Sequence, residues 1–349
     1  MHIVFRVDAS DKIGTGHVYR CLFFAHHYAK NHSISFICKK HSFHLIEKIK
    51  EKYPCYILEL KKTDHVNLNP DTWLGESQLK DVQKTISVIE ENKLNVDWMV
   101  IDHYAIDIQW EREIKPFVKR ICVVDDFIHR PHDCDIYINQ QISFPVFMNL
   151  TSKICYGNDY LMVHPQYFLF TPPIRTTVKR IHIFMGGADI HNITNDLIDL
   201  LHASHLNVEF DIVIGKANPH ATQLKKKIEN PAYKAFHYYE DIQFMGDILQ
   251  RADLAIGAPG SSSYERVITR TPTLMICIAE NQKTVIQKFI DAKTVLYCGT
   301  YQDNYKDKLM DYLQLILNTN IYKEMVMNCG NMIDLKKNKI HKLLDEGAS

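Results

Sequence analysis

Short apolar segments alternate with amphipathic segments along this chain, and the alternation runs twice. In the first half, strand-like apolar runs occur at 2–7, 34–38, 55–59, 97–101, 120–124 and 135–139. Helix-like stretches fall between several of these runs, at 17–30, 43–52, 79–93 and 107–117. Apolar strands that alternate with helices are typical of a parallel sheet covered on both faces.

The alternation stops around residues 168–175, where Pro172 and Pro173 indicate a linker. It then restarts, with strands expected at 179–185, 209–214, 253–257, 273–277 and 294–297. Helices are expected at 193–203, 220–229, 241–250, 262–270 and 283–291, with long helices from about 303 onward. The sequence therefore predicts an α/β protein of two Rossmann-like parallel-sheet domains facing a cleft, with domains at 1–170 and 171–349. Ligands of such folds bind beyond the carboxyl ends of strands, so the turns after strands are the places to search.

Composition excludes several classes of protein. Lys plus Arg equals Asp plus Glu at 41 each, which argues against a nucleic-acid partner. There is no apolar run of about 18 residues and no secretory signal pattern, so we expect no membrane insertion. The nine cysteines are scattered without a CxxC pair, as in a cytoplasmic enzyme with reduced thiols rather than a zinc or disulfide protein. We expect a cytoplasmic monomer.

The first turn after a strand reads Gly14-Thr15-Gly16-His17 and leads into a helix. Glycines let the backbone approach a ligand closely, and a histidine at a helix start is a candidate base. The alternative is an ordinary turn that happens to carry a histidine. Tyr19 stands where a dinucleotide fingerprint would have its third glycine, so this is not that motif.

Two further turns of the first half carry polar residues. After the run at 97–101, Asp102 either orients an imidazole or caps the next helix, and Tyr104 is a candidate to hydrogen-bond a substrate. The pair Asp125 and Asp126 follows the next strand. Adjacent residues of an extended chain point in different directions, so we expect a loop braced by side-chain hydrogen bonds here rather than a metal site.

In the second half, two strand-to-helix turns are rich in small residues. Gly186 and Gly187 follow one strand, and Gly260, Ser261 and Ser262 follow another. Backbone N–H groups at a helix start attract phosphate, so we expect a diphosphate at the serine-rich turn. Simple helix capping by the serines is the alternative. Glu265, one turn into that helix, is suited to accept hydrogen bonds from a ribose diol.

Several of these motifs together resemble one known family. They occur in order from residue 6 to about residue 282 and comprise Arg6–Ser10, Ile13–Val18 with Arg20 and Cys21, Ile101–Tyr104, Val124–Asp126, His132–Asp135 with Asn139, Met185–Asp189 with Asn192, Gly257–Glu265, and Asn281 with Gln282. In these segments the chain is similar to the PseG family, the UDP-2,4-diacetamido-2,4,6-trideoxy-β-L-altropyranose hydrolases of pseudaminic acid biosynthesis.

The resemblance implies a glycosyltransferase-B fold and hydrolysis of a UDP-sugar without a metal or other cofactor. It implies that His17 serves the reaction, and that Tyr104 lies on the sugar side. It also implies that the serine-rich turn and Glu265 hold UDP, with Asn281 in a loop near it. We place Asp8 and the Gly14–Gly16 turn on the sugar side, and Gly186 and Gly187 on the UDP side.

These assignments predict a mechanism. His17 acts as general base on a water that attacks the anomeric carbon, UDP leaves, and the configuration inverts. UDP is a good leaving group once N–H donors hold its charge, so no strong general acid is required. A UDP-sugar-dependent glycosyltransferase of the same fold is the main alternative, and a sugar-nucleotide binding module without turnover is a third.

Overall fold

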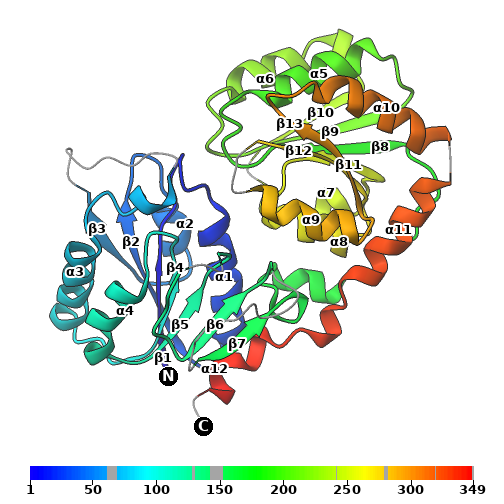
Figure 1. Cartoon of the computed structure of the whole chain (residues 1–349). Helices are drawn as coiled ribbons and strands as arrows, with labels where there is room; N and C mark the ends of the chain where they lie inside the picture. Colours follow the sequence, from blue (N-terminus) through cyan, green and yellow to red (C-terminus); the bar gives the residue numbers. More distant parts are fainter. Residues whose placement is uncertain are drawn as a thin grey trace. The chain divides into compact units, whose positions relative to one another are not determined.

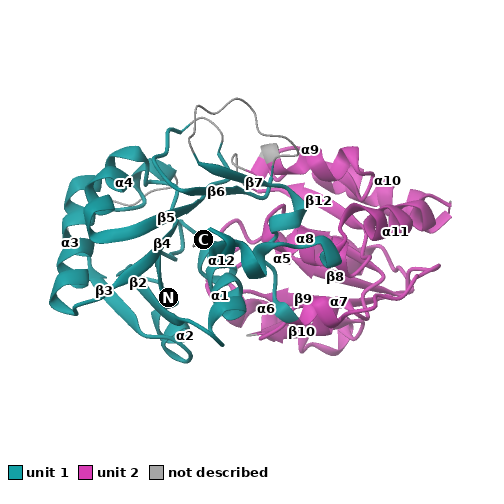
Figure 2. Ribbon diagram, turned by 90° about the horizontal axis from the view of Figure 1, so that it is seen from below, with its two compact units in different colours: residues 1–165, 335–349 teal, residues 166–334 magenta. Residues whose placement is uncertain are grey.

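The computed structural model describes residues 1–60, 69–127, 130–141, 152–240, 242–278, 282–318 and 320–347. The chain divides into two compact units: unit 1 comprises residues 1–165 and 335–349, and unit 2 comprises residues 166–334 (Figure 2). The sequence pattern predicts a boundary at 170/171, with the C-terminal residues in the second domain. In the structure, the division falls at 165/166 and residues 335–349 belong to unit 1.

Unit 1 contains a seven-stranded sheet in the order β3-β2-β1-β4-β5-β6-β7 (Figure 1). All of its paired strands are parallel, and their bounds are β1 His2–Val7, β2 Ser33–Lys40, β3 Cys55–Glu59, β4 Val96–Asp102, β5 Val118–Val124, β6 Ile136–Asn139 and β7 Lys153–Tyr156. In the centre, Phe5 of β1 pairs with Phe36 of β2 and Val100 of β4. The sequence pattern predicts β1 to β6 but not β7.

Alternate residues of the central strands pack against different layers, as a pleated sheet requires. Ile3, Phe5 and Val7 share a core with helices α1 (Gly16–Tyr28) and α2 (Ile46–Lys50). Residues of the opposite parity, such as Val4 and Met99, share a core with α3 (Gln78–Glu91) and α4 (Ile108–Ile114). Because both faces are covered, most positions of the central strands are apolar and buried.

The C-terminal residues of the chain pack against α1 of unit 1. The Tyr28 hydroxyl donates to the Ile340 carbonyl at 2.7 Å and accepts from the Leu344 N–H at 2.9 Å. Leu343 and Leu344 of the short helix α12 (Leu343–Glu346) are buried in the same core. These contacts are the reason that residues 335–349 belong to unit 1, and their spacing in the sequence gives no sign of it.

Unit 2 contains a six-stranded parallel sheet in the order β10-β9-β8-β11-β12-β13. Its strands are β8 Arg180–Phe184, β9 Glu209–Ile214, β10 Phe236–Glu240, β11 Leu254–Gly257, β12 Thr273–Cys277 and β13 Val295–Thr300. The sequence pattern predicts all of these except β10. That edge strand reads Phe-His-Tyr-Tyr-Glu, and its polar groups hide the apolar signal.

The helices of unit 2 include α5 Ile193–Ala203, α6 Ala221–Ile228, α7 Gly246–Leu249, α8 Ser261–Ile268, α9 Lys283–Asp291, α10 Tyr305–Asn318 and α11 Ile321–Met332. Among the described residues, no helix has the length and apolar character that crossing a bilayer requires. The prediction of an α/β protein with two parallel-sheet domains is confirmed.

Candidate functional site

His17 lies at the start of α1, after the turn that follows β1. The turn is closed by the Gly14 N–H, which donates to the Ser10 carbonyl at 2.8 Å. Gly14 has a φ of +82°, a conformation that residues with a side chain rarely adopt. Thr15 precedes the helix and Gly16 opens it, so His17 is its second residue. The His17 side chain is 10% exposed, which leaves one edge of the ring accessible.

Asp102, the last residue of β4, is fully buried and contacts the His17 ring. The His17 Nδ1 lies 2.7 Å from Asp102 Oδ1. Burial on its own raises the pKa of Asp102, but the Arg20 charge and then His17 hold it well below its usual range. An ionised carboxylate only accepts hydrogen bonds, so His17 Nδ1 carries the proton between them. In the neutral ring Nε2 is therefore the basic nitrogen.

Of the two roles considered for Asp102, the geometry supports orientation of an imidazole. The cap of the following helix α4 is a different residue, Asp107, whose Oδ1 accepts from the Gln109 N–H at 2.9 Å. An aspartate behind a histidine fixes the ring and its tautomer, and it stabilises the imidazolium that forms when the ring takes a proton.

Arg20, one helical turn after His17, joins two carboxylates. Its Nε and Nη2 each lie 2.5 Å from oxygens of Asp102, and its Nη1 lies 2.7 Å from Asp126 Oδ2. The Tyr104 hydroxyl donates to the same Asp126 oxygen. Burial, and then the Asp126 charge, raise the pKa of Tyr104 well above its usual range, so it remains a donor. Arg20 therefore links Asp102, which contacts His17, to Asp126, which contacts Tyr104.

Aromatic side chains form a wall beside His17. The ring centroids of His17 and Tyr104 are 4.5 Å apart, and those of His17 and Trp73 are 5.9 Å apart, both edge-on. Trp73 and Tyr104 stack at 5.6 Å, and Phe127 packs on Tyr104 at 4.7 Å. The Arg130 guanidinium carbon lies 5.5 Å from the Tyr104 centroid. Such a wall can pack against the apolar face of a sugar ring while Nε2 handles a polar group.

The Asp125–Asp126 turn is braced by hydrogen bonds, as expected. Asp125 accepts from the Phe127 N–H at 2.8 Å and from Arg130 Nη2 at 2.7 Å. His132 Nε2 lies 3.0 Å from Asp125, while its Nδ1 lies 2.6 Å from Glu111. Although burial opposes it, these two carboxylates raise the pKa of His132 to about 9. Within the described ranges, no group of three or more His, Cys, Asp or Glu side chains is arranged to hold a metal ion.

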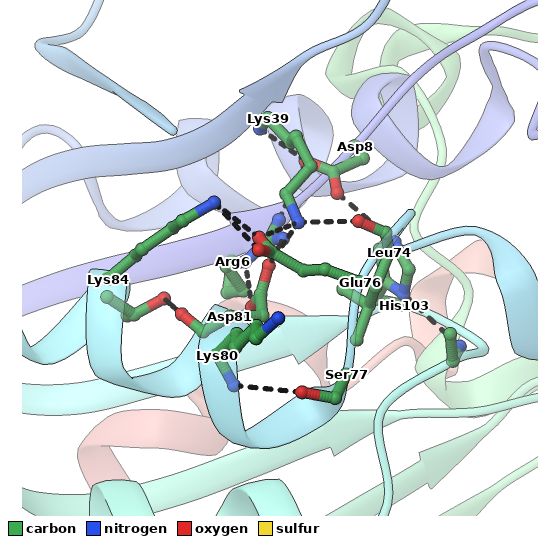
Figure 3. Close-up of polar contacts among 12 residues, drawn as sticks. Arg6, Asp8, Lys39, Leu74, Glu76, Ser77, Lys80, Asp81, Lys84 and His103 are labelled. Atoms are coloured by element: carbon green, nitrogen blue, oxygen red, sulfur yellow. Dashed lines mark hydrogen bonds and ion pairs between the residues drawn. The ribbon is translucent and has the colours of Figure 1, made fainter. Parts of the chain in front are cut away.

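Asp8 is fully buried within an ionic cluster on the α3 face of the sheet (Figure 3). Its Oδ1 accepts from Arg6 Nη1 at 2.7 Å and from the Lys39 N–H at 2.6 Å, and its Oδ2 lies 3.1 Å from His103 Nε2. Arg6 and Lys39 also pair with Asp81 of α3, each at 2.8 Å. The sequence analysis places Asp8 against the sugar, whereas this burial leaves it to brace the ends of β1 and β2.

In unit 2, Gly186 and Gly187 follow β8, and Gly186 has a φ of +95°. A Cβ on Gly215 would lie 2.3 Å from the Gly187 carbonyl oxygen, so the turns after β8 and β9 touch through backbone alone. The Asp189 carboxylate accepts from the Ile193 and Thr194 N–H groups at 2.9 and 3.0 Å. The start of α5 thus already holds an anionic side chain.

The start of α8 has no such internal anion. Gly260 is the N-cap, Ser261 is exposed, and Ser262 is partly buried. Helix geometry leaves the first N–H groups of α8 without a partner inside the helix, and they point toward any bound anion. Glu265 is partly buried one turn further on. Burial raises the pKa of Glu265 to about 7, while the neighbouring Tyr167 and Arg266 act to lower it.

Within unit 1, the structure brings together His17, Tyr104 and the Gly14–Gly16 turn. Asn281, also predicted as a site residue, lies outside the described residues. Single motifs gave no role in the site to Arg20 or Trp73, and they predicted only that Asp126 belongs to a braced loop. The i, i+3 spacing of His17 and Arg20 was an available signal, whereas Trp73 lies outside every predicted strand and helix and follows none of the turns considered.

Solved structures of glycosyltransferases have the same fold as this chain. The spinosyn rhamnosyltransferase SpnG has a TM-score of 0.69 at 11% identity, over 98% of this chain and 99% of its own. MurG of Acinetobacter baumannii has a TM-score of 0.65 at 12% identity, over 99% and 98%. The predicted glycosyltransferase-B fold is thereby confirmed.

The sequence of a known enzyme is also similar to this chain and indicates a substrate. The chain is 24% identical over 292 residues to the UDP-2,4-diacetamido-2,4,6-trideoxy-β-L-altropyranose hydrolase of Campylobacter jejuni. The match covers 81% of this chain and 94% of the relative, and it confirms the resemblance stated from the motifs. No family model matches the chain.

Proposed function

We propose that this protein is a UDP-sugar hydrolase that cleaves UDP-2,4-diacetamido-2,4,6-trideoxy-β-L-altropyranose, or a close analogue, to UDP and the free sugar. The match over 94% of the Campylobacter jejuni hydrolase supports the substrate class. The observation that carries the chemistry is the 2.7 Å contact between His17 Nδ1 and the buried Asp102. The reaction belongs to pseudaminic acid biosynthesis, and a cytoplasmic location fits a nucleotide-sugar substrate.

In the proposed mechanism, His17 Nε2 takes a proton from water as the oxygen attacks the anomeric carbon. The bond between that carbon and the diphosphate oxygen breaks, UDP departs with the bonding pair, and the configuration inverts. Asp102 keeps the Nδ1 proton in place and stabilises the imidazolium that forms. Positioned general-base catalysis typically contributes ~10²–10⁴-fold in rate.

The aromatic wall gives the sugar a place in this proposal. Tyr104, Trp73 and Phe127 place apolar side chains around His17, which suits a deoxy sugar that carries a methyl group. The Gly14–Gly16 turn leaves room beside the ring because nothing lies within 4 Å of a Cβ built on Gly14. Tyr104 acts through its ring and through Asp126, since its hydroxyl already donates there.

Unit 2 supplies the UDP groups in the proposal. The N–H groups of Ser261 and Ser262 hold the diphosphate beside Gly260, and Glu265 accepts from the ribose hydroxyls. Charge on the departing UDP is then stabilised by fixed dipoles. Gly186 and Gly187 contact the nucleotide through their backbone. The start of α5 does not bind it, because Asp189 already accepts from the first N–H groups of that helix.

The competing function is transfer of the sugar to an acceptor. It has to be considered because solved structures of the same fold are glycosyltransferases. The test is to incubate the protein with the UDP-sugar in buffer without any acceptor and to measure UDP release. Stoichiometric UDP and free sugar at a rate that His17→Asn abolishes supports hydrolysis. UDP release that requires an added acceptor would identify a transferase instead.

A further inference from the structure

Arg266 is a buried cation beneath the serine-rich turn at the start of α8. Its exposure is 0%, and its guanidinium extends back toward the first turn of the helix. Nη2 donates to the Ala258 carbonyl at 2.7 Å and to Ser263 Oγ at 2.9 Å. Nε and Nη1 are buried without a hydrogen-bond partner. Among the described residues, no carboxylate lies within ion-pair distance of this guanidinium.

A buried charge without an ion-pair partner is costly, so its presence needs a reason. The adjoining glycine shows that the local backbone is built around this side chain. A Cβ on Gly257 would lie 2.0 Å from Arg266 Nη1 and 2.9 Å from the Phe184 carbonyl oxygen. Gly257 therefore makes room for the guanidinium between β11 and α8.

The guanidinium also fixes the shape of the turn. Ser263 Oγ accepts from the Gly260 N–H at 3.2 Å while it accepts from Arg266 at 2.9 Å. One end of the turn is thus held at the Ala258 carbonyl and the other at the Ser263 hydroxyl. The Arg266 charge also acts on another buried group of unit 2. Burial, and then the Arg266 charge, lower the pKa of the buried His182 to about 3.

We propose that Arg266 is a positioning residue for the diphosphate of the nucleotide substrate, holding the 257–263 turn in its anion-binding shape and supplying the positive charge that the bound anion balances. This inference rests on the proposed function, because it takes the ligand at α8 to be UDP. Arg266 does not touch the ligand in this account. It acts through Ser263 and the helix-start N–H groups, and through its field in a low-dielectric interior.

Calorimetric titration of UDP and of uridine separates this role from a purely structural one, because uridine lacks the diphosphate. Arg266→Met keeps the side-chain length and removes the charge, and it is expected to weaken UDP binding about tenfold or more. Uridine should lose less affinity, because it lacks the diphosphate and is affected only through the pKa of the neighbouring Glu265. Arg266→Lys restores part of the loss. Arg270→Met is the matched control, because it removes the same charge just beyond the other end of α8, and it leaves both affinities unchanged.

Equal weakening of UDP and uridine by Arg266→Met, or no weakening of UDP, would overturn the inference. If Arg266→Met does not fold, Ser263→Ala tests the same link, with a smaller but still UDP-selective loss of about threefold expected. Unchanged UDP affinity in Ser263→Ala would count against the inference. If the wild-type protein binds neither UDP nor uridine, the proposed function itself is refuted. If the wild type binds UDP and the variants bind it equally well, only the role of Arg266 is refuted.

Discussion

Replacing Asp102 with Asn tests the account of His17 most sharply. The carboxylate now accepts from His17 at 2.7 Å and from two nitrogens of Arg20 at 2.5 Å, and it is completely buried. An amide is isosteric, but its NH₂ group can donate to His17 Nδ1 and so leave the ring proton on Nε2. The nitrogen that should attack the water proton is then blocked.

We expect Asp102→Asn to lower kcat about 10²–10⁴-fold, with a much smaller change in KM, because the tautomer of the general base is wrong. Loss of one partner from a buried ion pair should also cost about 3–5 kcal/mol of unfolding free energy. Steady-state release of UDP measures the first effect, and urea denaturation measures the second.

Asp126→Asn is the matched control, since Asp126 also pairs with Arg20 at 2.7 Å but makes no hydrogen bond or ion pair with His17. It should lower stability comparably while reducing kcat far less. The reasoning is refuted if both variants lose the same activity, or if Asp102→Asn keeps near wild-type kcat.

Three further predictions concern other parts of the protein. His132, with a pKa of about 9 against 6.5 when unfolded, stabilises the fold fully below pH 6.5, and the effect is lost as pH rises through 9. In urea denaturation, the difference in unfolding free energy between wild type and His132→Gln should therefore shrink by about 3 kcal/mol between pH 6.5 and pH 9. A difference that stays constant with pH would contradict this role of His132. The pKa of Glu265 is about 7, so the protein should bind UDP more tightly as this carboxyl ionises with rising pH. In calorimetry, Glu265→Gln should flatten that part of the pH dependence of UDP affinity. Parallel pH profiles for wild type and Glu265→Gln would exclude a role of Glu265 in ribose binding. Gly215→Ala would place a Cβ 2.3 Å from the Gly187 oxygen, so it should displace that turn and raise KM for the UDP-sugar several-fold, and an unchanged KM would separate Gly187 from the UDP site.

Most of the fold could be predicted from the sequence because both sheets are buried on both faces. A strand covered on both faces reads as a nearly continuous apolar run, and β11 and the Trp98–Ile101 part of β4 are clear examples. The signal fails at the sheet edges. Strand β10 has one buried position and carries tyrosines and a histidine, and β7 likewise has only one buried position.

The sequence could predict which turns contribute residues to the candidate site, but not which side chains contact one another. The sequence places His17 and Asp102 each after a strand, and adjacent parallel strands bring their carboxyl ends to one edge. That these two residues, 85 positions apart, share a hydrogen bond depends on which strands are neighbours and on the rotation of α1. The pattern also placed Asp8 in the site, because periodicity does not show that Arg6 and Lys39 already occupy its carboxylate.

The most direct test of the central claim is proton NMR of the products as they form from UDP-2,4-diacetamido-2,4,6-trideoxy-β-L-altropyranose in the absence of an acceptor. We predict UDP together with free sugar that first appears as the anomer opposite to the substrate, before mutarotation mixes the two. The His17→Asn variant should bind UDP and release the sugar at least about 10²-fold more slowly. Retention of configuration, or undiminished turnover by His17→Asn, would contradict the mechanism.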